Sequence, residues 1–287
     1  MKLCFDIGGM SLKTVVFEKT EIIHREDFVY GKYLDHLELI EKMNEIISKL
    51  TKKYQIDGIG ISSPGVVDVT TTQVMGESGI KNCSKMNYRR DLKTDIRIEV
   101  ENDAFAAAEA QITYNLDTRD KKTMLFIVGT GLGGSLIIDN KVYKGTNLLA
   151  GNFGLIAFDI DLATISIGHL DGSVGSIIRN YNKLTGNEAT GKEIMAKYYH
   201  DDNAKEVVDR MIKVLAQTII CANAVVDSEL VLIGGGISQN DDFIQLLTKR
   251  VDGFMNIMGE VYSRKFEIKP CKYAQDANPY GALSLLK

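Results

Sequence analysis

The sequence lacks several features, and each absence excludes a class of protein. Its 287 residues include only four cysteines, at positions 4, 83, 221 and 271, and no two of them form a CxxC pair. Isolated thiols are typical of reduced cysteines in a cytoplasmic protein, and we expect that location here. No stretch approaches the roughly 18–20 apolar residues that a membrane helix needs. Residues 1–5 carry no charged leader before a long apolar run, so we expect no signal peptide.

An excess of basic charge is also missing. Lys and Arg number 34 against 38 Asp and Glu, which gives a net charge of −4. No long basic run occurs, so we expect no nucleic-acid partner. Only three prolines are present, at positions 64, 270 and 279, and no Ser/Pro-rich linker divides the chain. The composition is 45% hydrophobic and 25% charged, as in soluble globular proteins of one large domain or two modest ones.

Three glycine-rich turns organise the sequence, and each follows a short apolar run. They are Leu3–Lys13 (LCFDIGGMSLK), Met124–Ser135 (MLFIVGTGLGGS) and Leu230–Ser238 (LVLIGGGIS). The first two turns are followed by another apolar run, which predicts β-hairpins. A Rossmann nucleotide site would instead need glycines at the start of a helix, so we exclude that kind of site here.

Two similar hairpins predict a duplicated architecture of two α/β domains with a cleft between them. We place the first domain at 1–107 and the second at 108–274, and expect a helix at about 275–287 to pack back on the first. Apolar spacing and composition predict the remaining elements. Strands are expected at Gly58–Ser62 and Arg97–Val100, and helices at Leu34–Leu50, Ala104–Ala110, Lys205–Asp227 and Asn278–Leu286.

The glycine turns are candidate phosphate sites, because glycine lets backbone N–H groups approach a triphosphate closely. Asp6 ends the first strand, where a carboxylate can hold Mg²⁺ directly or through water. Ser11 and Lys13 follow the turn and could touch phosphate. The third turn, Gly234, Gly235 and Gly236, could accept the base and ribose. The alternative is that each glycine turn is only a turn.

Asp103 is the candidate catalytic residue. The segment Ile98–Ala108 (IEVENDAFAAA) predicts a strand that ends at Glu101–Asp103 and a helix that follows at once. Asp103 is therefore expected as the N-cap of that helix. It could also accept the proton of a sugar hydroxyl during phosphoryl transfer, while the neighbouring Asn102 orients sugar hydroxyls. The two roles are compatible.

These motifs resemble, in order, those of the ROK sugar kinases. They are DIGGMSLK, SSPG at Ser62–Gly65, END at Glu101–Asp103, GTGLGG, AGNFG at Ala150–Gly154 and LIGGGIS. The resemblance implies two actin-like (ribonuclease H-like) α/β domains that flank an ATP and sugar cleft, and a homodimer. It implies that the first phosphate loop includes Asp6, Gly8, Gly9 and Ser11, the second Gly129, Thr130, Gly131 and Gly133, and that the sugar contacts include Gly79, Asn102 and Asp103.

Two departures from the family pattern concern the sugar site. Asn152 stands where the family usually has a sugar-binding glutamate, and Leu155 stands where it has a zinc-binding histidine. The family's three zinc cysteines are absent from Asp159–Gly175. We therefore expect no zinc site. His169 and Asp171 lie near the position of the missing glutamate, and either could replace a sugar contact or be an ordinary turn residue.

The resemblance implies an enzyme that uses ATP and Mg²⁺ to phosphorylate the 6-hydroxyl of a hexose or N-acetylhexosamine. N-acetylmannosamine, in sialic acid catabolism, is the favoured substrate. A glucokinase or β-glucoside kinase is the alternative, and a non-catalytic sugar sensor is an alternative of another class. The family's repressors carry an N-terminal DNA-binding domain, and from the early position of Asp6 we expect the enzyme rather than a repressor.

Overall fold

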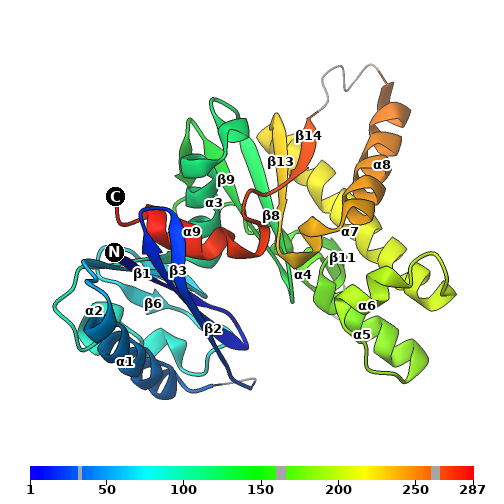
Figure 1. Ribbon diagram of the computed structural model, residues 1–287. Coiled ribbons are helices and arrows are strands. Elements are labelled where there is room, and N and C mark those ends of the chain that lie inside the picture. Colours follow the sequence, from blue (N-terminus) through cyan, green and yellow to red (C-terminus); the bar gives the residue numbers. More distant parts are fainter. Residues whose placement is uncertain (32–33, 160–165, 260–265) are drawn as a thin grey trace. The chain divides into compact units, whose positions relative to one another are not determined.

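The computed structural model describes residues 1–31, 34–159, 166–259 and 266–287 (Figure 1). The chain forms two compact units. The first comprises Met1–Asn115, Thr146–Leu149 and Asp276–Lys287, and the second comprises Leu116–Gly145 and Ala150–Gln275. The boundary expected after residue 107 falls inside a helix, α3 (Asp103–Tyr114), that belongs wholly to the first unit.

The first unit is built on a five-stranded sheet. The strand order is β3-β2-β1-β4-β7, and β1, β2 and β3 are antiparallel, whereas β1, β4 and β7 are parallel. The strands are β1 (Lys2–Ile7), β2 (Ser11–Glu18), β3 (Glu21–Val29), β4 (Gly58–Ser63) and β7 (Ile98–Asn102). A small hairpin of β5 (Val66–Asp68) and β6 (Gln73–Met75) follows β4. The predicted first hairpin is confirmed.

Helices cover both faces of this sheet (Figure 1). Helix α1 (His36–Lys53) begins at Asp35, whose side chain accepts a hydrogen bond from the Leu37 amide, and its apolar stripe packs on one face of the sheet. Helices α3 and α9 (Ala277–Ser284) lie against each other, and α9 packs on the other face. The short α2 (Tyr88–Asp91) precedes β7.

The second unit repeats this topology. Its sheet has the order β10-β9-β8-β13-β14, with an antiparallel meander followed by two parallel strands. The strands are β8 (Thr123–Val128), β9 (Leu132–Ile138), β10 (Lys141–Tyr143), β13 (Leu230–Gly234) and β14 (Glu267–Pro270), with β11 (Ala157–Asp159) and β12 (Ser166–Ile167) as a separate pair. The duplicated architecture and the second hairpin are therefore confirmed.

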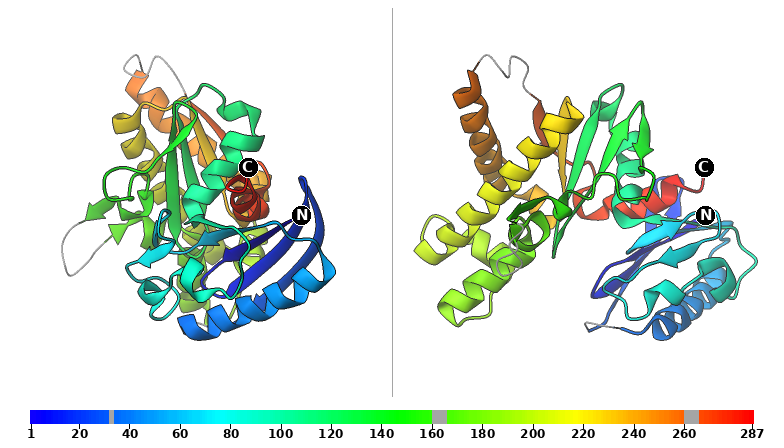
Figure 2. Two further views of the ribbon diagram at one scale, coloured as in Figure 1. Left: turned by 90° about the vertical axis from the view of Figure 1, so that its left-hand side faces the viewer. Right: turned by 180° about the vertical axis from the view of Figure 1, so that it is seen from behind.

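Two long helices, α7 and α8, pack side by side over the second sheet (Figure 2). Helix α7 (Asp202–Val226) begins at Asp201, whose side chain accepts hydrogen bonds from the amides of Asn203 and Ala204. The other helices of this unit are α4 (Gly168–Asp171), α5 (Val174–Thr185), α6 (Gly191–Ala196) and α8 (Asp241–Met258). The helices expected at 205–227 and 278–286 are thus confirmed, with ends that differ by a few residues.

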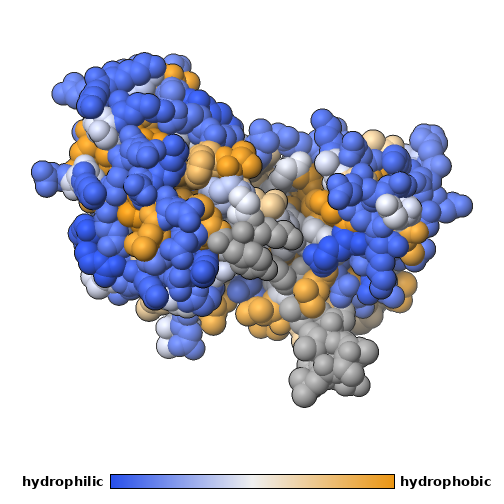
Figure 3. Space-filling view, turned by 90° about the horizontal axis from the view of Figure 1, so that it is seen from below, coloured by the Kyte–Doolittle hydropathy of each residue, from blue (hydrophilic) through white to orange (hydrophobic). Residues whose placement is uncertain are grey.

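Hydrophilic residues cover most of the face drawn in Figure 3, and apolar residues form scattered groups on it, as on globular proteins generally. None of the helices in the described ranges is long and apolar enough to span a membrane.

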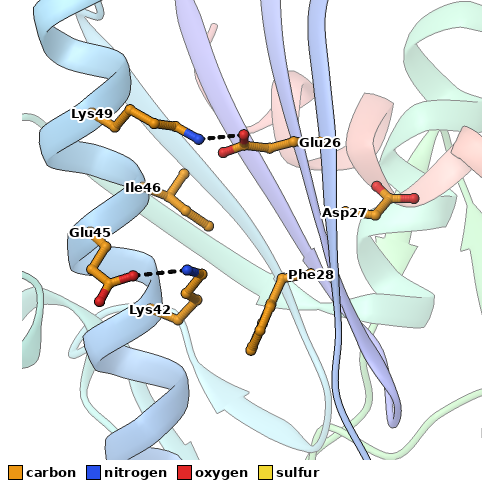
Figure 4. Close-up of a pocket in the computed structure, with 7 residues that line it drawn as sticks. All are labelled: Glu26, Asp27, Phe28, Lys42, Glu45, Ile46 and Lys49. Carbon is orange, nitrogen blue, oxygen red and sulfur yellow. Dashed lines mark hydrogen bonds and ion pairs between the residues drawn. The ribbon is translucent and has the colours of Figure 1, made fainter.

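One pocket of the first unit, of about 310 Å³, lies between β3 and α1 (Figure 4). Lys49 pairs with Glu26 there, and Lys42 pairs with Glu45 at 2.8 Å while its ammonium group lies 5.2 Å from the centre of the Phe28 ring. These cations are already neutralised by carboxylates. No residue predicted for the functional site lines this pocket, so we do not assign the site to it.

Candidate active site

The predicted first phosphate loop joins β1 to β2 and is closed by its own backbone. The Gly8 amide donates to the Ser11 carbonyl at 2.9 Å. The Tyr30 hydroxyl, from the end of β3, donates to the Gly8 carbonyl at 2.5 Å and to the Ser11 carbonyl at 3.2 Å. Burial and the nearby Asp6 raise the pKa of Tyr30, so its hydroxyl keeps the proton that it donates. The loop is therefore held in shape before any ligand binds.

Asp6 is the last acidic residue before this loop and is almost fully buried, with 5% of its surface exposed. Its Oδ1 accepts hydrogen bonds from the Ser62 hydroxyl at 3.3 Å and from the Asn278 amide at 3.0 Å. Its Oδ2 accepts from the Lys13 ammonium at 3.0 Å. Lys13 lies opposite Asp6 in the hairpin register, which explains the pair. Ser62 and Asn278 were not predicted from the sequence.

Asn102, and not Asp103, is the N-cap of α3, which corrects the prediction. Asn102 keeps extended backbone angles, and its side-chain oxygen accepts from the amides of Ala104 and Phe105 at 3.0 and 3.2 Å. Asp103 is already the first helical residue. Its Oδ1 accepts from the Ala104 amide at 2.8 Å and from the Asn102 side-chain amide at 2.9 Å. The cap thus fixes where the catalytic candidate points.

The pKa of the Asp103 carboxyl is higher than that of an ordinary aspartate. Burial is the main cause that raises its pKa to about 6, and the negative charge of Asp6 adds to the effect. Hydrogen bonds from Ala104 and Asn102 act in the opposite direction, because they favour the ionised form. A carboxyl with a pKa near neutral pH can take up and release a proton readily, as a general base must.

Other predicted residues of the first unit lie around this pair. A Cβ atom at Gly79 would meet the Cα of Gly9 at 3.3 Å, so the loop expected to contact the sugar touches the first phosphate loop. The Gly65 carbonyl accepts from the Asn102 side chain at 2.9 Å, which ties the SSPG segment to the strand end. That segment is anchored in turn by Ser63, whose hydroxyl lies 2.7 Å from that of the fully buried Tyr88.

The predicted second phosphate loop joins β8 to β9 in the second unit. The Gly129 amide donates to the Gly131 carbonyl at 2.9 Å, and the first turn of α5 closes on this loop, since the Gly175 amide donates to the Gly129 carbonyl at 3.1 Å. A Cβ atom at Gly175 would lie 2.1 Å from the Thr130 carbonyl oxygen. Gly133 lies within β9, where it pairs with Ile127. Glycine is required at 175 for this approach.

The third turn lies beside the second, because β13 and β8 are parallel neighbours whose ends meet. Gly234 ends β13 and Gly236 begins a short 3₁₀-helix, η4 (Gly236–Gln239). Gly235 between them has a φ of +87°, and a Cβ atom there would lie 2.3 Å from the Val128 carbonyl oxygen. The structure thus brings the second and third predicted nucleotide turns together.

The candidate replacements for the family's sugar contacts lie in the second unit. Asn152 precedes a 3₁₀ turn, η3 (Phe153–Leu155), whose Phe153 ring stacks on Phe126 with centroids 4.2 Å apart. Leu155 is exposed. The Asp171 carboxylate pairs with Arg210 at 3.2 Å, which favours the structural alternative for that residue. The side chain of His169 lies outside the described residues.

The described residues contain no group of three or more His, Cys, Asp or Glu side chains placed to hold a metal ion. This donor set does not conflict with Mg²⁺ that arrives with a nucleotide, because such an ion is held by one or two carboxylates together with phosphate oxygens and water. Asp6 is the carboxylate at the first phosphate loop that fits this role.

The two units share one sheet order and have glycine loops at their strand ends, as in the actin-like ATPase fold, and the similarities to known kinases identify the chain as an ATP-dependent sugar kinase. More particularly, the chain belongs to the ROK family, whose model matches residues 2–287. An N-acetyl-D-glucosamine kinase of Aliivibrio fischeri is 28% identical over 286 residues, with 90% of this chain and 91% of the relative covered. An N-acetylmannosamine kinase of Haemophilus influenzae is 23% identical over 295 residues, with 99% and 95% covered.

A solved structure of a ROK family protein from Streptococcus pneumoniae in complex with sucrose is also similar. It has a TM-score of 0.85 and 25% identity, and covers 99% of this chain and 96% of its own.

Proposed function

We propose that the protein transfers the γ-phosphoryl group of ATP to the 6-hydroxyl of an N-acetylhexosamine, with N-acetylmannosamine as the preferred substrate. The observation that carries the proposal is the Asp103 carboxylate, which is held at a strand end by Asn102 and has its pKa raised to about 6 beside the first phosphate loop. The curated relatives named above act on two N-acetylhexosamines, which supports this substrate class.

Asp103 serves as the general base. Its carboxylate accepts the proton of the sugar hydroxyl, whose oxygen bonds to the γ-phosphorus while the bond from that phosphorus to the bridging oxygen of ADP breaks. Backbone amides of the glycine loops stabilise the phosphate charge, and Lys13, which pairs with Asp6, would do so by turning from Asp6 to the phosphate. Asp6 would hold the Mg²⁺ that accompanies ATP, and that ion supplies further charge neutralisation.

The substrate is tested by a coupled assay of ADP release with N-acetylmannosamine, N-acetylglucosamine, glucose, mannose, fructose and cellobiose. We expect the highest kcat/KM with N-acetylmannosamine. A higher value with glucose or cellobiose would favour the glucokinase or β-glucoside kinase alternative. Sugar-dependent thermal stabilisation without ADP release for any sugar would support a sensor and contradict the proposal.

The base is tested by Asp103→Asn, which keeps the size of the side chain and removes its basicity. We expect kcat to fall by about 10²- to 10⁴-fold, because general base catalysis contributes that much. Asp95→Asn is the matched control, since Asp95 is exposed and is not among the residues proposed for the site. The kcat of this variant should stay within about twofold of the parent value, as is usual for surface substitutions. Near-parental turnover of Asp103→Asn would remove Asp103 from the role of base.

The family resemblance also leads us to propose a homodimer. Size-exclusion chromatography with light scattering should give twice the mass of the chain, and the mass of a single chain would contradict this.

A further inference from the structure

Asp6 is held by a residue far from it in the sequence. The Asn278 side-chain amide donates to Asp6 Oδ1 at 3.0 Å across 272 positions of the chain. We propose that Asn278 is a positioning residue that sets the orientation of the Asp6 carboxylate toward a magnesium–nucleotide complex. The proposal rests on the proposed function, because it gives Asp6 the magnesium ion that accompanies ATP.

The burial of Asp6 makes its hydrogen bonds important. A buried carboxylate that lacks donors is strongly disfavoured. Among the contacts described, Oδ1 is bound by two neutral donors, Asn278 and Ser62, and Oδ2 by the charged donor Lys13. Asn278 and Ser62 therefore fix the rotation of the carboxylate, while the Lys13 ammonium pairs with its other oxygen. A carboxylate that is to meet a metal ion needs a fixed direction, and the two neutral donors supply it.

The helix that carries Asn278, α9, is packed closely against its neighbours through backbone contacts. A Cβ atom at Gly60 of β4 would lie 2.2 Å from the Ala282 carbonyl oxygen, and a Cβ atom at Gly281 would lie 1.9 Å from the Ala106 carbonyl oxygen. Helix α9 thus touches the backbones of both β4 and α3. Strand β4 carries Ser62, which donates to Asp6, and α3 begins with Asp103. Helix α9 therefore packs against both elements that position these carboxylates.

A purely structural role for Asn278 makes a different prediction from a positioning role. A structural residue would change stability and would alter the binding of all ligands together. A positioning residue for a metal-binding carboxylate would alter the binding of magnesium–ATP, and would leave metal-free ATP and the sugar unaffected. The comparison of these ligands is therefore the decisive measurement, and it requires no turnover.

The experiment is calorimetric titration of Asn278→Ala with MgATP, with ATP in excess EDTA, and with the preferred sugar. We expect the affinity for MgATP to fall about tenfold, as for the loss of one hydrogen bond to a charged group, while the other two affinities change less than twofold. Ser284→Ala is the matched control on the same helix, because its hydroxyl donates back to the Tyr280 carbonyl of that helix at 2.9 Å. This control should bind all three ligands like the parent.

Equal MgATP affinity of a folded Asn278→Ala and the parent would overturn the proposal, as would an equal loss for all three ligands. If Asn278→Ala does not fold, Asn278→Leu keeps the volume of the side chain and is judged by the same outcomes. Failure of the proposed function is distinguishable. A parent protein that binds MgATP but phosphorylates none of the sugars would contradict the proposed kinase function. The positioning role of Asn278 would still be decided by comparing the MgATP and metal-free ATP affinities of Asn278→Ala with those of the parent.

Discussion

At the scale of single residues, the pair Asn102–Asp103 divides two tasks between neighbouring side chains. Asn102 satisfies the free amides at the start of α3, and Asp103 is left at the first helical position with one carboxylate oxygen held. Both N–H groups of the Asn102 amide are donated within the protein, one to Gly65 and one to Asp103. Asn102 therefore orients the Asp103 carboxylate, which we propose as the base, whether or not it also contacts sugar.

The pKa of Asp103 leads to a prediction about pH. Only the ionised carboxylate can accept a proton, so kcat/KM should fall as the pH drops through about 6. Asn102→Ala removes a donor that favours the ionised form, which should raise the pKa of Asp103 and move this acidic limb to higher pH. The measurement is the pH profile of kcat/KM from 5 to 9.

Asn87→Ala is the matched control for the lost helix cap. Asn87 caps α2 by accepting from the Arg90 amide and makes no contact with Asp103 among those described. Both substitutions should cost about 1 kcal/mol of stability, but only Asn102→Ala should move the acidic limb. A limb that stays in place in Asn102→Ala would show that another group controls it.

At the scale of elements, the first turn of α5 packs directly on the predicted second phosphate loop, and we expect the shape of that loop to depend on this contact. Gly175→Ala would force the first turn of α5 away from the Thr130 carbonyl, because backbone atoms cannot yield as a flexible side chain can. We expect MgATP affinity to fall about tenfold or more, the effect of 1–3 kcal/mol of strain from overpacking, with little change in sugar affinity. Calorimetric titration measures both.

Gly253→Ala provides the comparison for that substitution. Gly253 lies within α8, and a Cβ atom there would meet nothing within 4 Å. Alanine favours a helix interior over glycine by about 1 kcal/mol, so this variant should be slightly more stable and bind MgATP like the parent. Parental MgATP affinity in Gly175→Ala would mean that the loop does not depend on α5.

The sequence predicts the elements far better than the contacts between them. Hairpins and helices follow from local apolar spacing, and Asp6, Gly8 and Asp103 stand out because each lies where a strand ends. Gly175, Asn278 and Gly281 carry no such local signal, because the groups that they approach lie in other elements. Their importance depends on backbone distances that only the folded chain defines. The cap was misassigned for a related reason, since Asn and Asp are equally good caps and adjacent.

At the scale of the whole molecule, each unit has its own hydrophobic core. The larger cluster comprises residues of the second unit, around β8, β13, α7 and α8, and another comprises residues of the first unit, around β1, β4 and α1. Separate cores predict that the units can open independently.

Phe126→Ala tests this independence. Phe126 is fully buried in the second core and stacked on Phe153, so its loss should cost about 3–5 kcal/mol. Hydrogen exchange followed by mass spectrometry should show faster exchange in Leu116–Gly145 and Ala150–Gln275, with the first unit unchanged. Met43→Ala, in the core of the first unit, should give the reverse pattern. Equal acceleration throughout the chain would indicate a single cooperative unit.

The contact between Asn278 and Asp6 also has a consequence for biosynthesis. A ribosome that has translated the chain as far as Pro270 has already produced Asp6, Asp103 and the glycine loops. The nascent protein would still lack α9, and with it both a donor to the buried carboxylate and the backbone that packs on Gly60 and Ala106. The chain should therefore acquire magnesium-dependent nucleotide binding only late in its synthesis, after all of the glycine motifs that predict nucleotide binding have been translated.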